Sequence, residues 1–100
     1  WRNGLRTAWV LDAVGKERPI TFGVVIDGGR IERLEVLAFR ESRGGEIRHA
    51  FYTDQYRHAG LDGDQRLDQG VDGITGATLS HRAAKRATRL ALILHQQVVD

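Results

Sequence analysis

Residues 20–39 read Ile-Thr-Phe-Gly-Val-Val-Ile-Asp-Gly-Gly-Arg-Ile-Glu-Arg-Leu-Glu-Val-Leu-Ala-Phe, and this stretch decides the fold class. Ile20–Asp27 is rich in β-branched residues and alternates in polarity, which predicts a strand. Two glycines follow within Asp27–Arg30 and accept the positive φ angles of a tight turn, so a hairpin is expected. Ile31–Phe39 then returns with apolar residues on both faces, which predicts a central strand partly covered on each side. One face of the first strand carries Ile20, Phe22, Val24 and Ile26.

The segments on either side extend this hairpin into an α+β domain. Leu5–Val14 alternates loosely and predicts a preceding strand, which the turn Gly15–Pro19 joins to the hairpin. Ile47–Ala59 mixes aromatic and charged residues and predicts a short helix that stops at Gly60. Leu79–Val98 predicts the main helix. Its expected apolar stripe is Ala83, Ala87, Leu90, Ala91 and Leu94. We therefore expect one domain, residues 1–100, in which an antiparallel meander of about three or four strands packs on the C-terminal helix.

Composition excludes several classes of function. The 15 basic residues nearly balance the 13 acidic ones, so nucleic acid is not an expected partner. The absence of cysteine excludes disulfides, thiolate metal sites and a cysteine nucleophile. Asp62–Asp64 resembles the start of a calcium loop, but Leu67 and Gly73 stand where that loop needs its glycine and its bidentate glutamate. No metal is therefore expected.

Targeting signals are not visible in the sequence. No apolar run approaches the roughly 20 residues of a membrane span. Position 1 is not methionine, so we expect the chain to begin inside a longer precursor.

The segment Asp72–Ser80, Asp-Gly-Ile-Thr-Gly-Ala-Thr-Leu-Ser, lies where a loop becomes the main helix. The start of a helix exposes unpaired N–H groups and the positive end of the helix dipole, which suits a phosphate. Gly73 and Gly76 would let a ligand approach the backbone closely. From these residues alone two interpretations stay open. The segment is either an anion site or an ordinary cap, in which Thr78 as N-cap contributes about 1 kcal/mol.

The order Asp72-x-x-Thr75-Gly76-Ala77-Thr78, followed by Leu-Ser, resembles the flavinylation motif of the FMN-binding domain family. That family includes the flavin-carrying subunits of the sodium-pumping NADH:quinone reductase and of the Rnf complex, and small periplasmic FMN-binding proteins. In it the last threonine of the motif carries FMN through a phosphodiester bond, which a separate flavin transferase makes. The resemblance implies that Thr78 is the acceptor. The cofactor-binding residues that it implies here are Asp72, Gly73, Ile74, Thr75, Gly76, Ala77, Thr78 and Leu79.

A second segment resembles the same family. From its residues alone, the loop Arg40–Glu46 is expected to be an ordinary surface turn. Within it Glu41-Ser42-Arg43-Gly44 is similar to a Glu-Thr-Pro-Gly-type loop that lies close to the flavin in family members, with serine and arginine replacing threonine and proline. The resemblance implies that Glu41, Ser42, Arg43 and Gly44 belong to the flavin site. Arg43 would pair with the FMN phosphate or a ring oxygen, because guanidinium donors suit both. Arg82 and Lys85 lie within about two turns of the helix start, close enough to offset a phosphate's charge.

The resemblance implies a redox carrier on the periplasmic or extracytoplasmic face of the membrane. It would hold covalent FMN and pass electrons between redox partner proteins that are themselves membrane-associated. Such a domain is the substrate of a flavin transferase rather than an enzyme in the strict sense. The alternative is a module that binds FMN non-covalently, or another anion, with a regulatory or structural role.

Two other interpretations carry less weight. Hydrolysis through Ser80 and His81 is disfavoured, because adjacent helix residues point in different directions and no orienting acid is identified. Phe51, Tyr52 and Tyr56 are expected in the core rather than stacked on a flavin.

Overall fold

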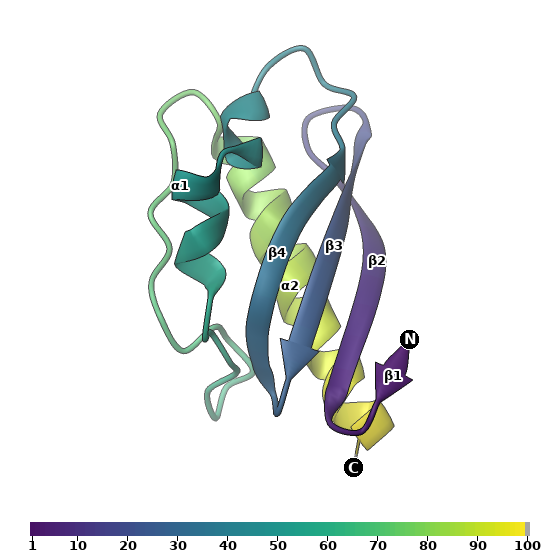
Figure 1. The fold of residues 1–100 in the computed structure, drawn as a ribbon. Helices are drawn as coiled ribbons and strands as arrows, with labels where there is room; N and C mark the ends of the chain where they lie inside the picture. Colours follow the sequence, from purple (N-terminus) through teal and green to yellow (C-terminus); the bar gives the residue numbers. More distant parts are fainter. Residues whose placement is uncertain (100) are drawn as a thin grey trace.

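The computed structural model describes residues 1–99, which form an antiparallel sheet with one long helix across it (Figure 1). The strands lie in the order of the chain: β1 (Arg2–Asn3), β2 (Arg6–Val14), β3 (Pro19–Asp27) and β4 (Arg30–Ala38). The long helix, α2, covers Thr78–Val99 and packs mainly on β2 and β3. The α+β architecture predicted from the sequence is therefore confirmed.

The hairpin between β3 and β4 forms as expected. Gly28 and Gly29 take φ angles of 62° and 83°, which a side chain at either position would resist. The four apolar side chains of the inward face of β3 are 0–1% exposed and form the centre of the core: Ile20, Phe22, Val24 and Ile26. The alternation read from the sequence therefore identifies the buried face correctly.

The expectation that Ile31–Phe39 is a central strand is wrong, because β4 lies at the edge of the sheet and β3 lies inside it. A register shift between Val25 and Ile26 interrupts the two-residue period of β4. Ile31 and Leu34 both reach the core as a result, although they are three residues apart. On the other face, Leu37 is 52% exposed and lies over Gly23. The apolar residues on both faces thus reflect a bulge and a covered glycine, not burial between two layers.

The sequence did not predict β1. The short mid-chain helix that it predicted is present, but its α-helical part is brief and a 3-10 turn lies on each side of it. Arg2 donates from Nη1 to the carbonyl of Val98 at 2.6 Å, which ties β1 to the end of α2. The mid-chain turns are η1 (Gly45–Arg48), α1 (Ala50–Thr53) and η2 (Asp54–Tyr56). The extended conformation of His49 separates η1 from α1, whereas η2 follows α1 directly.

The aromatic residues of these turns divide between the core and the surface. Tyr52 and Tyr56 are fully buried, as predicted. Phe51 is 65% exposed, so its assignment to the core is wrong.

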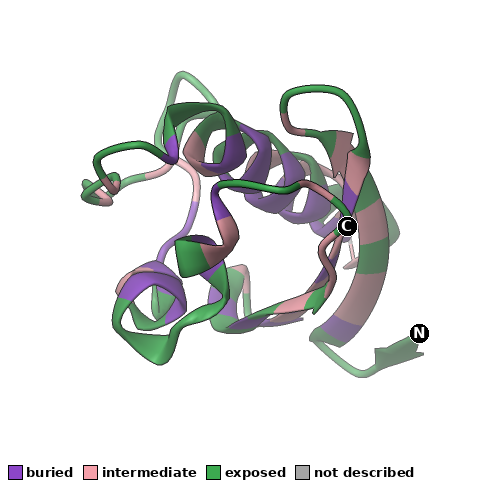
Figure 2. Cartoon of the chain, turned by 90° about the horizontal axis from the view of Figure 1, so that it is seen from above, coloured by how far each residue is buried: buried purple, intermediate pink, exposed green. Residues whose placement is uncertain are grey.

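The helix α2 contacts the sheet through small and polar side chains and through Leu92, and of the predicted stripe only Ala83, Ala87 and Ala91 are buried. Figure 2 shows the buried positions recurring along one side of this helix. They are Ser80, Ala83, Ala84, Ala87, Thr88, Ala91, Leu92 and His95. Leu90, expected in the stripe, is 46% exposed, and Leu94 is only partly buried.

The contact face of α2 differs from the predicted stripe because polar side chains of this helix are buried with hydrogen-bond partners. His95 Nδ1 lies 2.7 Å from Thr7 Oγ1 on β2, and Thr88 Oγ1 donates to the carbonyl of Ala84 at 2.9 Å. A hydrogen-bonded polar side chain can be buried at little cost, so the contact face of α2 is rotated away from Leu90.

None of the helices in residues 1–99 combines the length and the apolar character that a membrane span requires.

Candidate functional site

A pocket of about 640 Å³ lies between the loop that follows β4 and the start of α2. Its walls bring together parts of the two segments that the sequence singled out. The nearest lining residues of the two, Gly44 and Gly76, are 32 positions apart in the chain. The lining residues are Lys16, Glu41, Ser42, Arg43, Gly44, Gly76, Ala77, Thr78, Leu79 and Ser80. Of the expected site residues, Asp72, Gly73, Ile74 and Thr75 do not line this pocket.

The first turn of α2 offers free backbone donors beside the pocket. Gly76 takes a φ angle of +86°, and the N–H of Ala77 donates to Ile74 at 2.9 Å, which turns the chain into the helix. The first i to i−4 bond of α2 runs from the N–H of His81 to the carbonyl of Ala77. In the described part of the chain, the N–H groups of residues 78–80 have no acceptor. They and the positive end of the helix dipole favour an anion.

This geometry corrects the expected cap. Ala77 occupies the N-cap position, and Thr78 is the first residue of α2. Thr78 is exposed, and its hydroxyl makes no hydrogen bond with any residue in 1–99. The Thr78 hydroxyl therefore does not cap or otherwise hold the helix.

The loop after β4 is held in place by Glu41. Its Oε1 accepts hydrogen bonds from the backbone N–H of Glu17, at 3.1 Å, and from that of Arg18. This carboxylate therefore stabilises the turn between β2 and β3, and the same contact brings Lys16 to the wall of the pocket. Lys16 was not predicted as a site residue, because only the pairing of Glu41 with this distant turn would indicate it, and no local sequence pattern reveals that pairing.

Gly44 lets this loop pass directly over the first turn of α2. Its φ angle is +90°, and a Cβ placed on it would overlap the hydroxyl of Ser80. Ser80 itself is only 4% exposed. A side chain at position 44 would thus be both strained and obstructed, so glycine is required here to close the pocket.

The pocket is electropositive. Lys16 and Arg43 both line it, and neither side chain has an ion pair or hydrogen bond within residues 1–99. Glu41 is the lining acid, and its charge is met by the N–H groups of the turn. Two unpaired cations beside free helix N–H groups make a donor set that suits a phosphate. Arg82 and Lys85, expected to assist, line a different groove instead.

The start of the motif is held by two half-buried polar side chains, those of Gln55 and His81. The Gln55 amide brackets the Asp72 backbone: Oε1 accepts from its N–H at 2.7 Å, and Nε2 donates to its carbonyl at 3.1 Å. The imidazole of His81 lies against Gly73, where an added Cβ would come within 3.2 Å of it. These contacts place residues 72–75 as a support of the pocket rather than as its lining.

His81 also ends a chain of three hydrogen-bonded side chains. Tyr52 Oη lies 2.7 Å from Tyr56 Oη and 2.7 Å from His81 Nδ1. Burial raises the pKa of Tyr52 to about 12 against the opposing effect of its Tyr56 hydrogen bond, and burial raises that of Tyr56 as well. Burial, and secondarily the charge of Lys85, lowers the pKa of His81 below its ordinary value of 6.5. The side chains of Tyr52, Tyr56 and His81 are therefore all uncharged at neutral pH.

We expect the stability of the domain to fall as the pH drops from about 6.5 through the lower folded-state pKa of His81. Below 6.5 the unfolded state binds more protons at His81 than the folded state does, so acid favours unfolding. Denaturant unfolding at a series of pH values measures this slope. His81→Gln should flatten it, and His49→Gln, at an exposed histidine, should not. Equal slopes in the wild type and His81→Gln would contradict the assignment.

Together, the fold and pocket define an α+β domain with a pocket suited to a phosphate-bearing ligand at the start of its long helix. A family model described as FMN-binding domain matches residues 15–93, from the turn after β2 to well inside α2. The chain therefore belongs to the FMN-binding domain family. No curated protein and no solved structure gave a match.

Family membership indicates FMN as the cofactor, and the pocket at the start of α2 fits it. A volume of about 640 Å³ lies within the roughly 300–1,000 Å³ of small-molecule sites. The phosphate of FMN matches the free N–H groups and the unpaired cations. Ala77 and Leu79 add apolar surface to the lining. FMN supplies the redox chemistry when it is bound, and the protein supplies attachment, orientation and electrostatics.

Proposed function

We propose that this chain is an electron-transfer domain that carries FMN covalently, as a phosphodiester on Thr78. One observation carries the proposal: the Thr78 hydroxyl is exposed and unpartnered, and it lies in the pocket beside free N–H groups and two unpaired cations. Its position in the motif supports the same residue.

The attachment requires a flavin transferase and an activated donor. A free phosphate monoester is a poor electrophile, so the donor holds FMN in a phosphoric anhydride such as a flavin dinucleotide. Thr78 Oγ1 forms the new P–O bond, the P–O bond to the rest of the donor breaks, and a base of the transferase takes the hydroxyl proton. The product phosphodiester keeps one negative charge. The first-turn N–H groups of α2, with Lys16 and Arg43, would hold that charge.

The setting of the domain is part of the proposal. We place it on the periplasmic or extracytoplasmic face of the membrane, where it exchanges electrons with membrane-associated redox proteins. The resemblance of its motif to that of the family's flavin-carrying subunits supports this setting. The domain itself would catalyse no reaction and would act as a carrier between its partners.

Intact mass tests the covalent bond directly. Protein co-expressed with a flavin transferase should gain the mass of one FMN less one water, and its yellow colour should survive denaturation and precipitation. Protein made without the transferase should lack both. Colour that is lost on unfolding in both preparations would favour the alternative, a non-covalent FMN module.

Arg43 should tune the flavin. We expect Arg43→Ala to lower the midpoint potential, because a nearby cation favours the more negatively charged reduced form. A contribution of about 1.4 kcal/mol corresponds to about 30 mV for a two-electron couple. Arg89→Ala is the control, because Arg89 lies eleven positions after Thr78 on α2 and does not line the pocket. Spectroelectrochemical titration measures both variants. Equal and negligible shifts would remove Arg43 from the flavin site.

A further inference from the structure

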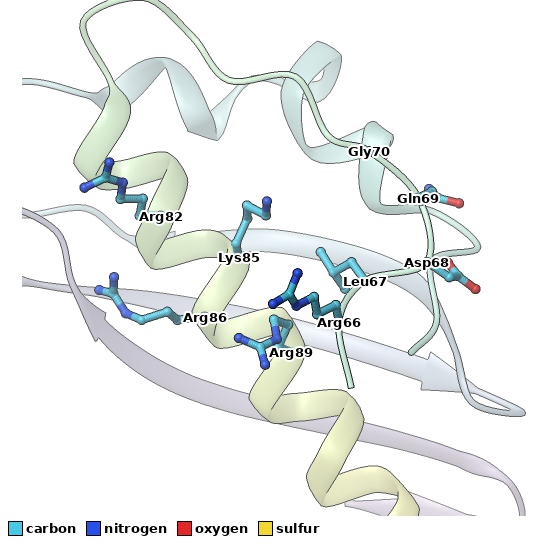
Figure 3. Close-up of a pocket in the computed structure, with 9 residues that line it drawn as sticks. All are labelled: Arg66, Leu67, Asp68, Gln69, Gly70, Arg82, Lys85, Arg86 and Arg89. Atoms are coloured by element: carbon cyan, nitrogen blue, oxygen red, sulfur yellow. The ribbon is translucent and has the colours of Figure 1, made fainter. Parts of the chain in front are cut away.

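A second groove, of about 700 Å³, lies between residues 66–70 and the outer face of α2 (Figure 3). Five of its lining side chains are cations, and one is an acid. They are Arg66, Arg82, Lys85, Arg86, Arg89 and Asp68. We call this surface the basic groove.

The acid of the basic groove does not neutralise its cations. Asp68 Oδ1 accepts from the N–H of Gly60 at 2.9 Å, and Oδ2 pairs with Arg30 at 3.1 Å. The Gly60 backbone hydrogen bond is the largest effect and lowers the Asp68 pKa; burial opposes it, and the hydrogen bond and charge of Arg30 lower the pKa further, so the carboxylate is ionised. Its partner is a cation outside the groove, and Figure 3 shows it directed away from the cations of α2. The groove therefore keeps a positive charge.

The cations themselves have no acidic partners. Arg86 donates to the carbonyl of Val14 at 2.6 Å, and Arg89 donates to that of Gln65 at 3.0 Å, and neither contact supplies a countercharge. Within residues 1–99 the side chains of Arg66, Arg82 and Lys85 make no ion pair or hydrogen bond. An anionic ligand would supply a negatively charged partner to all three side chains.

The basic groove adjoins the flavin pocket along the same helix. Its four α2 cations follow one another at intervals of three, one and three residues, so they span roughly 10 Å of the helix axis. The first of them, Arg82, lies one turn, about 6 Å along the axis, after Thr78. An occupant of the groove would therefore come close to a flavin on Thr78.

We propose that the basic groove docks an acidic segment of the redox protein that exchanges electrons with the flavin, an inference that rests on the function proposed above. The cations are mostly exposed and spread along the helix, so each would hold a small anion only weakly. Several weak contacts add up over a protein surface and orient it during encounter. Leu67 and the arginine stems also offer apolar contact, which a protein segment uses and a small phosphate does not.

A fluorescein-labelled poly-glutamate peptide tests the docking by fluorescence anisotropy on the flavin-loaded chain. Affinity should fall steeply with added salt. Arg82→Gln/Lys85→Gln should weaken binding about tenfold, an effect of about 1.4 kcal/mol. The matched control, Arg33→Gln/Arg57→Gln, loses the same charge at exposed residues away from the groove and should change affinity less than about twofold.

Three outcomes would overturn the docking proposal. One is an equal loss in both variants, which would mean that only net charge matters. Another is displacement of the peptide by inorganic pyrophosphate at lower concentration than the peptide itself requires, which would identify a small-anion site. The third is groove-dependent binding to anionic lipid vesicles without peptide binding. Intact mass of the same variants reports flavin attachment separately, so a failure of docking is distinguishable from a failure of the proposed function.

Discussion

Thr78→Val should carry no covalent flavin in a host that contains the transferase, whereas the wild type should be labelled. Valine has nearly the shape of threonine but lacks the oxygen that would form the proposed phosphodiester. The neighbouring hydroxyls are poor substitutes. Ser80 is 4% exposed beneath Gly44, and Thr75 does not line the pocket. Thr75→Val and Ser80→Ala should therefore keep the label, and Thr78→Ser should keep part of it.

The structure makes this substitution easy to interpret. Because Ala77 rather than Thr78 is the N-cap of α2, losing the hydroxyl removes no cap and breaks no hydrogen bond among the described residues. An exposed change of this kind usually alters stability by less than about 0.5 kcal/mol. Thermal unfolding of Thr78→Val should match the wild type while its intact mass lacks the flavin. Label that persists and maps to Thr75 or Ser80 would overturn the assignment of Thr78.

The fold was predictable where local chemistry decides it. The Gly28–Gly29 turn needs positive φ angles, and the alternation of β3 follows from burial of one face, so both could be read from neighbouring residues. The edge position of β4 could not be predicted in this way. The apolar residues on both faces of β4, which suggested a central strand, come from a bulge and from Leu37 covering Gly23 on the neighbouring strand.

The site was predictable only in part, and for a similar reason. The motif and the Glu41–Gly44 loop each have a recognisable sequence, and the structure places part of the motif and the whole loop around one pocket. Lys16 reaches that pocket through the bond of Glu41 to a distant turn. The contact face of α2 was misjudged at Leu90, because His95 finds its partner, Thr7, on a strand 88 residues away.

Leu92→Asp should unfold the domain, whereas Leu90→Asp should leave it folded. Leu92 is 1% exposed in the core between α2 and the sheet, and Leu90 is 46% exposed. A carboxylate at position 92 would lose its water and gain no partner, at a cost of several kcal/mol. A domain of this size has a free energy of unfolding of about 5–15 kcal/mol in total, so this cost would remove most or all of it.

The same substitution two positions earlier separates the effect of burial from that of helix propensity. Aspartate is a poorer helix former than leucine by about 0.5 kcal/mol, and both variants carry this cost. At position 90 the new carboxylate stays in water, one turn after Arg86 on α2, so the total loss should stay below about 1 kcal/mol. Circular dichroism during thermal unfolding compares the two. An unfolded Leu90→Asp beside a stable Leu92→Asp would mean that α2 meets the sheet through the stripe read from the sequence.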